Sequence, residues 1–124
     1  METTIAQQKI IQIESLVLDK LVQNTPSEQH LKCILRIIFL FSQKPYLNAT
    51  LTTNELRNDP IIVSLFKDSD FIKKLEGVLI WAEESNILTI SSKETANMDF
   101  SLSPSITWTL EKIPQNPAIA DTNN

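Results

Sequence analysis

The sequence predicts an α+β fold that is mostly helical, with an N-terminal helix, further helices in the middle and a β-hairpin towards the C-terminal end. Two observations carry this prediction. Apolar residues recur every three or four positions up to about residue 85, which is the spacing of helices that bury one face. From Ile87 onward they alternate with polar residues, which is the spacing of half-buried strands. At 124 residues the chain is long enough for one sizeable core.

The first helix is expected over residues 4–24, where Ile10, Ile13, Val17 and Leu21 recur at helical spacing. Residues 1–24 are therefore interpreted as an N-terminal helix used for packing or dimerisation. Its four apolar residues are candidates for a protein interface.

The second helix is expected from Pro26 to about Gln43. Thr25 can cap it, Pro26 suits the first helical position, and Glu28 can reach back to the free amide of the cap. Pro45 stops it.

The apolar residues of this second helix fall on two nearly opposite faces. One face carries Leu31, Ile34, Leu35, Ile38 and Phe41, and the other carries Cys33, Ile37 and Leu40. A helix that is apolar on both sides must be covered on both sides. We therefore expect it to be central, between the N-terminal helix and the elements that follow.

Three further helices are expected. The run Thr52-Thr53-Asn54-Glu55 has the pattern of a capping box and opens a short helix through Arg57. Asp59-Pro60 can start another turn up to Phe66. A longer helix, capped by Asp68 or Ser69, is expected from Asp70 to Ser85, with Asn86 as a left-handed terminator. Its core residues are Phe71, Leu75, Val78, Leu79 and Ala82.

The C-terminal part predicts a hairpin. Its first strand is Ile87-Leu88-Thr89-Ile90, and its polar tip runs from Ser91 to Asp99. Either the tip is long or the return strand is interrupted at Pro104. The return strand carries Phe100, Leu102, Ile106, Trp108 and Leu110. Residues 114–124 are polar and contain proline, so we expect a disordered tail.

The stretch from Pro26 to Lys112 resembles the winged helix-turn-helix superfamily in the order and length of its elements: helix, short helix, longer helix, hairpin. The stretch that begins Thr52-Thr53-Asn54-Glu55-Leu56 looks like the second helix of that fold. Residues 70–85 look like its recognition helix and residues 91–99 like its wing. We therefore expect a winged-helix-like domain over residues 25–113, although the extra turn from Pro60 to Phe66 departs from a tight helix-turn-helix.

The resemblance implies binding to duplex DNA, with the third helix in the major groove. The basic residues that would contact nucleic acid are Arg57, Lys67, Lys73, Lys74 and Lys93. The charge of the chain disfavours this function, because 11 Lys and Arg stand against 15 Asp and Glu, a formal charge of −4.

The outward face of the expected third helix favours contact with protein. With Phe71 and Leu75 toward the core, that face carries Lys73, Gly77, Ile80, Trp81 and Glu84. A helix that reads bases would present donors and positive charge instead. Gly77, Ile80 and Trp81 are therefore candidates for a protein interface. The alternative is that the N-terminal helix of the same chain covers them.

Enzymatic chemistry has little support in the sequence. A single Gly is too few for a phosphate-binding loop, and one His with one Cys cannot build the usual zinc cage. His30 and Cys33 stand three positions apart, but Cys33 lies on an apolar stripe, where a thiol is usually inert. We predict no catalytic residue, no cofactor and no metal.

The sequence therefore favours a non-enzymatic protein–protein interaction module that acts as a homodimer or as a small subunit of a larger complex. The alternative is a winged-helix DNA-binding transcription regulator. No secretory signal is visible, and the longest apolar run (residues 31–41) contains Lys32 and Arg36. We therefore expect a cytoplasmic protein with no membrane span.

Overall fold

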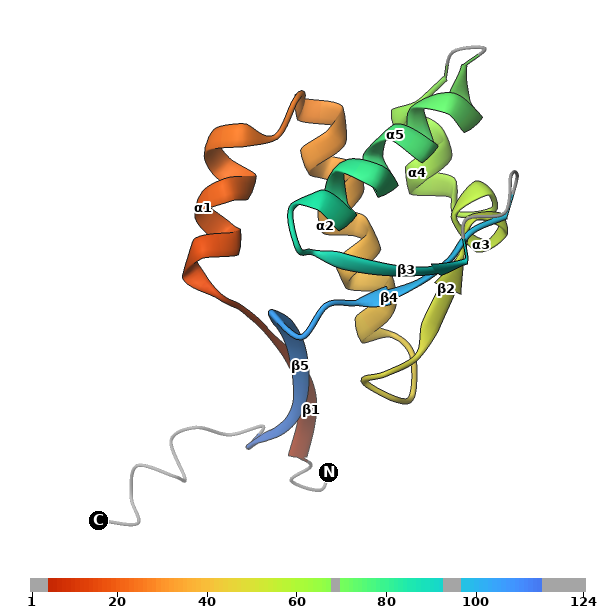
Figure 1. Ribbon diagram of the computed structural model, residues 1–124. Helices are drawn as coiled ribbons and strands as arrows, with labels where there is room; N and C mark the ends of the chain where they lie inside the picture. Colours follow the sequence, from red (N-terminus) through yellow and green to blue (C-terminus); the bar gives the residue numbers. More distant parts are fainter. Residues whose placement is uncertain (1–4, 68–69, 93–96, 115–124) are drawn as a thin grey trace.

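The computed structural model describes residues 5–67, 70–92 and 97–114, with side chains placed from Lys9 to Thr109 within these ranges (Figure 1). The protein is α+β and mostly helical, as predicted. The helices are α1 (Ser15–Asn24), α2 (Glu28–Ser42), α3 (Thr53–Arg57), α4 (Pro60–Leu65) and α5 (Phe71–Glu84). The strands are β1 (Ile5–Ile13), β2 (Thr50–Thr52), β3 (Leu88–Ser92), β4 (Asp99–Leu102) and β5 (Ile106–Pro114).

The prediction of one helix over residues 4–24 is wrong for its first half. Residues 5–13 form strand β1, which pairs antiparallel with β5 from Ile5↔Pro114 to Ile13↔Ile106. Ile10 and Ile13 therefore lie on a strand and not on a helical stripe with Val17. Three isoleucines near the end of β1 suit a strand as well as a helix, and the pairing with β5 decides between them.

The β1–β5 ribbon extends away from the helices, as Figure 1 shows, and joins them at one end. Ile106 is buried in the core at that end, and Ile13 packs against the core. Farther out, the Lys9 ammonium lies 4.6 Å from the centre of the Trp108 ring and donates a hydrogen bond to the carbonyl of Ser42. The charge of Lys9 is thus placed at the carboxyl end of α2, where the helix dipole favours a cation.

Helix α1 packs on the core through Val17 and Leu21, which are 4% and 1% exposed. The Thr25 hydroxyl donates a hydrogen bond to the carbonyl of Leu21 and so satisfies one of the last carbonyls of this helix. The expected helix therefore exists only in its second half, and its buried residues serve the fold of the chain itself.

Helix α2 is central, with α1 on one side of it and α4 and α5 on the other (Figure 1). Both of its predicted faces contribute buried residues, namely Cys33, Ile34, Ile37, Ile38 and Phe41. Leu35, expected on a covered face, is 47% exposed. The cap is Ser27 and not Thr25, because the Ser27 side chain accepts the hydrogen bond from the His30 amide.

Helices α3 and α4 begin where the sequence predicts. Thr52 and Glu55 form a complete capping box at α3. Asp59 caps α4 by accepting a hydrogen bond from the amide of Ile62, and Pro60 occupies the first turn. These helix starts are predictable from the sequence because the Thr52 and Asp59 side chains accept hydrogen bonds from backbone amides only three residues away.

Helix α5 has the predicted core. Leu75, Val78, Leu79 and Ala82 are fully buried, and Phe71 is half-buried. Asn86 follows the helix at a φ of 65°, the left-handed conformation expected of a terminator. Asp70 stands at the cap position without a side-chain hydrogen bond, and the expected caps Asp68 and Ser69 lie outside the described residues.

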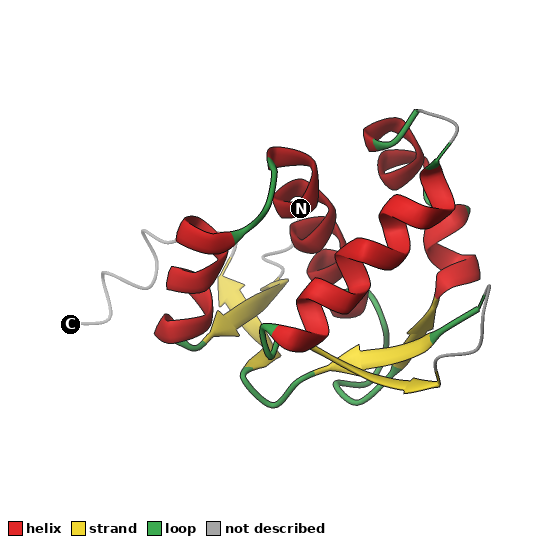
Figure 2. Cartoon of the chain, turned by 45° about the horizontal axis from the view of Figure 1, so that its top comes forward, coloured by secondary structure: helices red, strands yellow, loops and turns green. Residues whose placement is uncertain are grey.

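The other sheet has the strand order β2-β4-β3 and lies below the helices in Figure 2. Strands β3 and β4 form the predicted hairpin, whose tip includes residues outside the described ranges. After Leu102 the chain turns through Ser103, whose hydroxyl donates a hydrogen bond to the carbonyl of Asn86. The return strand is thus interrupted around Pro104, and its second part, β5, pairs with β1 instead.

The strand pairing crosses the expected boundary at residues 24 and 25, because β1 precedes it and β5 follows it. The segment 1–24 is therefore tied to the end of the expected 25–113 domain. The expected tail, 114–124, lies outside the described residues except for Pro114.

Candidate interaction surfaces

The interface residues predicted near the N-terminus are mostly not available to a partner. Val17 and Leu21 are buried in the protein's own core, and Ile10 and Ile13 are half-buried on β1. The prediction placed the apolar stripe correctly within α1, but that stripe packs against the rest of the chain. The apolar stripe of α1 is therefore a core face and not an interface.

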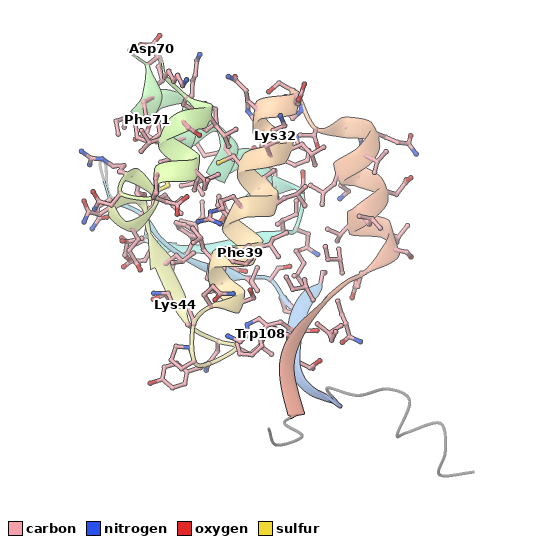
Figure 3. The ribbon with its side chains drawn as sticks, turned by 180° about the vertical axis from the view of Figure 1, so that it is seen from behind. Lys32, Phe39, Lys44, Asp70, Phe71 and Trp108 are labelled. Carbon is pink, nitrogen blue, oxygen red and sulfur yellow. The ribbon has the colours of Figure 1, made fainter. Side chains whose placement is uncertain are left out.

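A different part of α1 and α2 is apolar and exposed. Val22 is 74% exposed and Leu18 is 49% exposed, one turn apart on α1. Leu35 and Phe39 are 47% and 44% exposed, one turn apart on α2. Figure 3 shows the two helices side by side from behind, with Phe39 on the side of α2 that faces the viewer. We call these four residues the α1–α2 face.

Sequence reasoning missed this face for two reasons. Leu18 and Val22 widen the apolar stripe of the expected first helix, and a single wide stripe is interpreted as one packing face. Leu35 is assigned to a covered side of the second helix. Periodicity shows that a helix has an apolar side, but it does not show how wide a strip its neighbours cover. The unusual width of the apolar stripe was the signal that could have found the face.

The outward face of α5 is as predicted except at Trp81. Lys73, Gly77 and Glu84 are exposed, and Ile80 is 44% exposed. Trp81 is half-buried and packs against the core. The alternative in which the N-terminal helix covers this face and crosses at Gly77 is wrong, because a Cβ built at Gly77 meets no atom within 4 Å.

The candidate nucleic-acid contacts are spread over several elements. Arg57 ends α3, Lys67 follows α4, and Lys73 lies on α5, all exposed. Lys74 is half-buried on the flank of α5, and Lys93 lies outside the described residues. Acidic residues accompany the lysines on α5, namely Asp70, Glu76, Glu83 and Glu84. The exposed charge of α5 is therefore mixed and gives no uniform attraction for phosphates.

Two surface hollows flank α4. One, of about 380 Å³, lies between the end of α2 and α3. Two of its lining residues, Lys44 and Glu55, form an ion pair of 2.8 Å. The other, of about 520 Å³, is more apolar and is lined by Pro60, Val63, Ser64, Phe66, Lys67 and Phe71. The second hollow offers few polar groups to orient a small molecule. The first is lined by Gln43, Lys44, Glu55, Asn58 and Asp59, but Lys44 and Glu55 pair with each other and Asp59 pairs with Arg36.

The residues with intrinsic chemical reactivity are held in structural roles. Burial, with a further contribution from the charge of Asp59, raises the pKa of the Cys33 thiol to about 12. The ring of His30 makes a 2.8 Å hydrogen bond to the Ser27 hydroxyl at the start of α2. Desolvation lowers the pKa of His30 and so disfavours its charged form. A buried, protonated thiol is not an activated nucleophile.

Within the described ranges, no group of three or more His, Cys, Asp or Glu residues is arranged to hold a metal ion. Likewise, none of the helices that the structure describes is both long enough and apolar enough to cross a membrane. Comparison with protein-family models, with curated proteins and with solved structures finds no match for this chain.

Proposed function

We propose that this protein is a non-enzymatic protein–protein interaction module that docks a protein partner on the α1–α2 face. One observation carries the proposal. Four large apolar side chains on two adjacent helices are between 44% and 74% exposed, although the same helices supply much of the core. Large apolar side chains exposed on neighbouring helices are typical of protein interfaces.

A winged-helix-like arrangement is part of the proposal. Its support is the order of α2, α3, α5 and the β3–β4 hairpin, which is the order on which the resemblance rests. Helix α4 is the extra turn by which the chain departs from that pattern. We also propose a cytoplasmic location, supported by the free, buried thiol of Cys33, which suits a reducing compartment.

Site-specific photo-crosslinking in the native source tests the α1–α2 face. A photoreactive residue in place of Val22 or Leu35 should yield a discrete adduct with another protein. The matched control is Ile61, which is 48% exposed on α4 and lies outside the face. The same adducts from all three positions, or none from positions 22 and 35, would contradict the proposal.

The DNA-binding alternative has its own test. A gel shift with duplex DNA at low and moderate salt should show no retardation by this acidic protein. If the protein binds with a steep dependence on salt, and Arg57→Glu and Lys73→Glu abolish binding, the alternative replaces the proposal.

A further inference from the structure

The outward face of α5 carries an unusual combination of residues. Gly77, the one glycine of the chain, stands in the middle of this helix. Its φ is not positive, and a Cβ there would meet nothing within 4 Å. The fold therefore does not need a glycine at this position, although glycine weakens a helix relative to alanine.

The residues around Gly77 form a narrow seam. Lys73, Gly77, Ile80 and Glu84 follow one another at spacings of four, three and four, which is the heptad spacing of a two-helix contact. At 3.6 residues per turn they lie within an arc of about 60°. The buried residues Leu75, Val78 and Ala82 lie on the opposite side. Helix α5 crosses the front of the molecule in Figures 1 and 2. All four residues of the seam are exposed.

We propose that the α5 seam pairs with the same seam of a second copy of this chain, in antiparallel orientation. A twofold axis midway between Gly77 and Ile80 brings each Ile80 over Gly77 of the second copy. The isoleucine then fills the space that the glycine leaves, and the two backbones can approach closely. The same axis brings each Lys73 opposite Glu84 of the second copy, so that opposite charges meet at both ends.

The charge pattern selects the antiparallel arrangement. A parallel pair would place Lys73 against Lys73 and Glu84 against Glu84, and both contacts are repulsive. It would also leave a gap at Gly77. Neither Lys73 nor Glu84 takes part in the ion pairs Lys32–Glu28, Arg36–Asp59 and Lys44–Glu55 of the described residues. Both are exposed and available to a second copy.

This inference deepens the proposed function by naming a partner for a second surface, and it uses none of the residues of the α1–α2 face. The seam is only four residues long, so the dimer should be weak and reversible, with a Kd on the order of 10 µM. Its formation would cover Lys73 and keep α5 out of a DNA groove.

Sedimentation equilibrium of the full chain over a range of concentrations tests the pairing. Lys73→Glu or Glu84→Lys alone should raise the dimer Kd at least tenfold, because each creates like charges at both ends of the seam. The double variant should return to within about threefold of the wild-type Kd, since it restores opposite charges. Gly77→Leu should abolish the dimer, and circular dichroism should show an unchanged fold because the position is open.

Val22→Lys combined with Leu35→Lys is the matched control and should leave the dimer unchanged. If this control variant is monomeric while the α5 variants still form dimers, the inference is wrong and the α1–α2 face is the self-association surface. A wild-type chain that stays monomeric at millimolar concentration also overturns the inference, and the crosslinking result for the α1–α2 face is then judged separately. Charge reversals whose effects add instead of compensating overturn the antiparallel register.

Discussion

Arg36 on α2 and Asp59 before α4 are joined by two parallel hydrogen bonds, Nη2 to Oδ1 at 2.9 Å and Nε to Oδ2 at 3.1 Å. Asp59 is 8% exposed and also caps α4 through the Ile62 amide. The guanidinium of Arg36 lies 4.9 Å from the centre of the Phe39 ring. One carboxylate thus holds α4 against the central helix, and the same arginine lies beside the α1–α2 face.

We expect Asp59→Asn to lower the free energy of unfolding by about 2 kcal/mol, because it replaces charge-assisted hydrogen bonds with weaker ones. Asparagine still caps a helix, so Asp59→Ala should cost about 1 kcal/mol more. Urea unfolding followed by circular dichroism measures both. Equal losses for the two variants would show that the cap contributes nothing.

The stabilising effect of this pair should depend on pH. Hydrogen bonds from Arg36 hold the pKa of Asp59 below its ordinary value, although burial opposes the shift. The unfolded chain therefore takes up this proton at a higher pH than the folded chain, and stability is lost as pH falls through the lowered folded pKa.

Urea unfolding of the wild type and of Asp59→Asn between pH 2.5 and 7 measures this dependence. The difference in unfolding free energy should be constant above about pH 5 and shrink as the pH falls below about 4. A difference that is unchanged down to pH 2.5 would contradict the assignment.

The Cys33 thiol should be unreactive in the folded protein. With a pKa of about 12, raised by burial and by Asp59, only about one thiol in 10⁴ is ionised at pH 8. Alkylation by iodoacetamide, followed by mass spectrometry, should therefore be negligible until urea unfolds the chain. Rapid labelling under native conditions would contradict this prediction and would indicate that Cys33 is nucleophilic.

Gly77→Ala should stabilise the isolated chain by about 0.5–1 kcal/mol, because alanine reduces the entropy lost on folding and meets no neighbour. Thermal unfolding at a concentration too low for association measures this effect. Ser64→Ala, also at an exposed helical position, is a control that removes no glycine. A destabilised Gly77→Ala would show that the glycine serves the fold and not a partner.

Local signals in the sequence predicted the central elements well. The capping box at Thr52, the proline after Asp59, the core stripe of α5 and the turn at Asn86 are all confirmed. Each depends on residues within one or two helical turns. The outward position of Gly77 and Ile80 followed from the same stripe, since fixing the buried side of a helix also fixes its exposed side.

The rest depends on residues far apart in the chain. The nine residues of β1 are compatible with a helix until β5, about a hundred residues later, supplies their hydrogen bonds. The exposure of Val22 and Leu35 likewise depends on which other elements pack against α1 and α2. The spacing of apolar residues within a helix does not predict this packing.

The β1–β5 ribbon pairs the first strand that the structure describes with the last one that it describes. During translation, the backbone amides and carbonyls of β1 lack the hydrogen bonds of the β1–β5 pairing until residues 106–114 have left the ribosome. A nascent chain stalled before residue 106 therefore carries an unpaired, isoleucine-rich strand, which can associate with chaperones or with other incomplete copies.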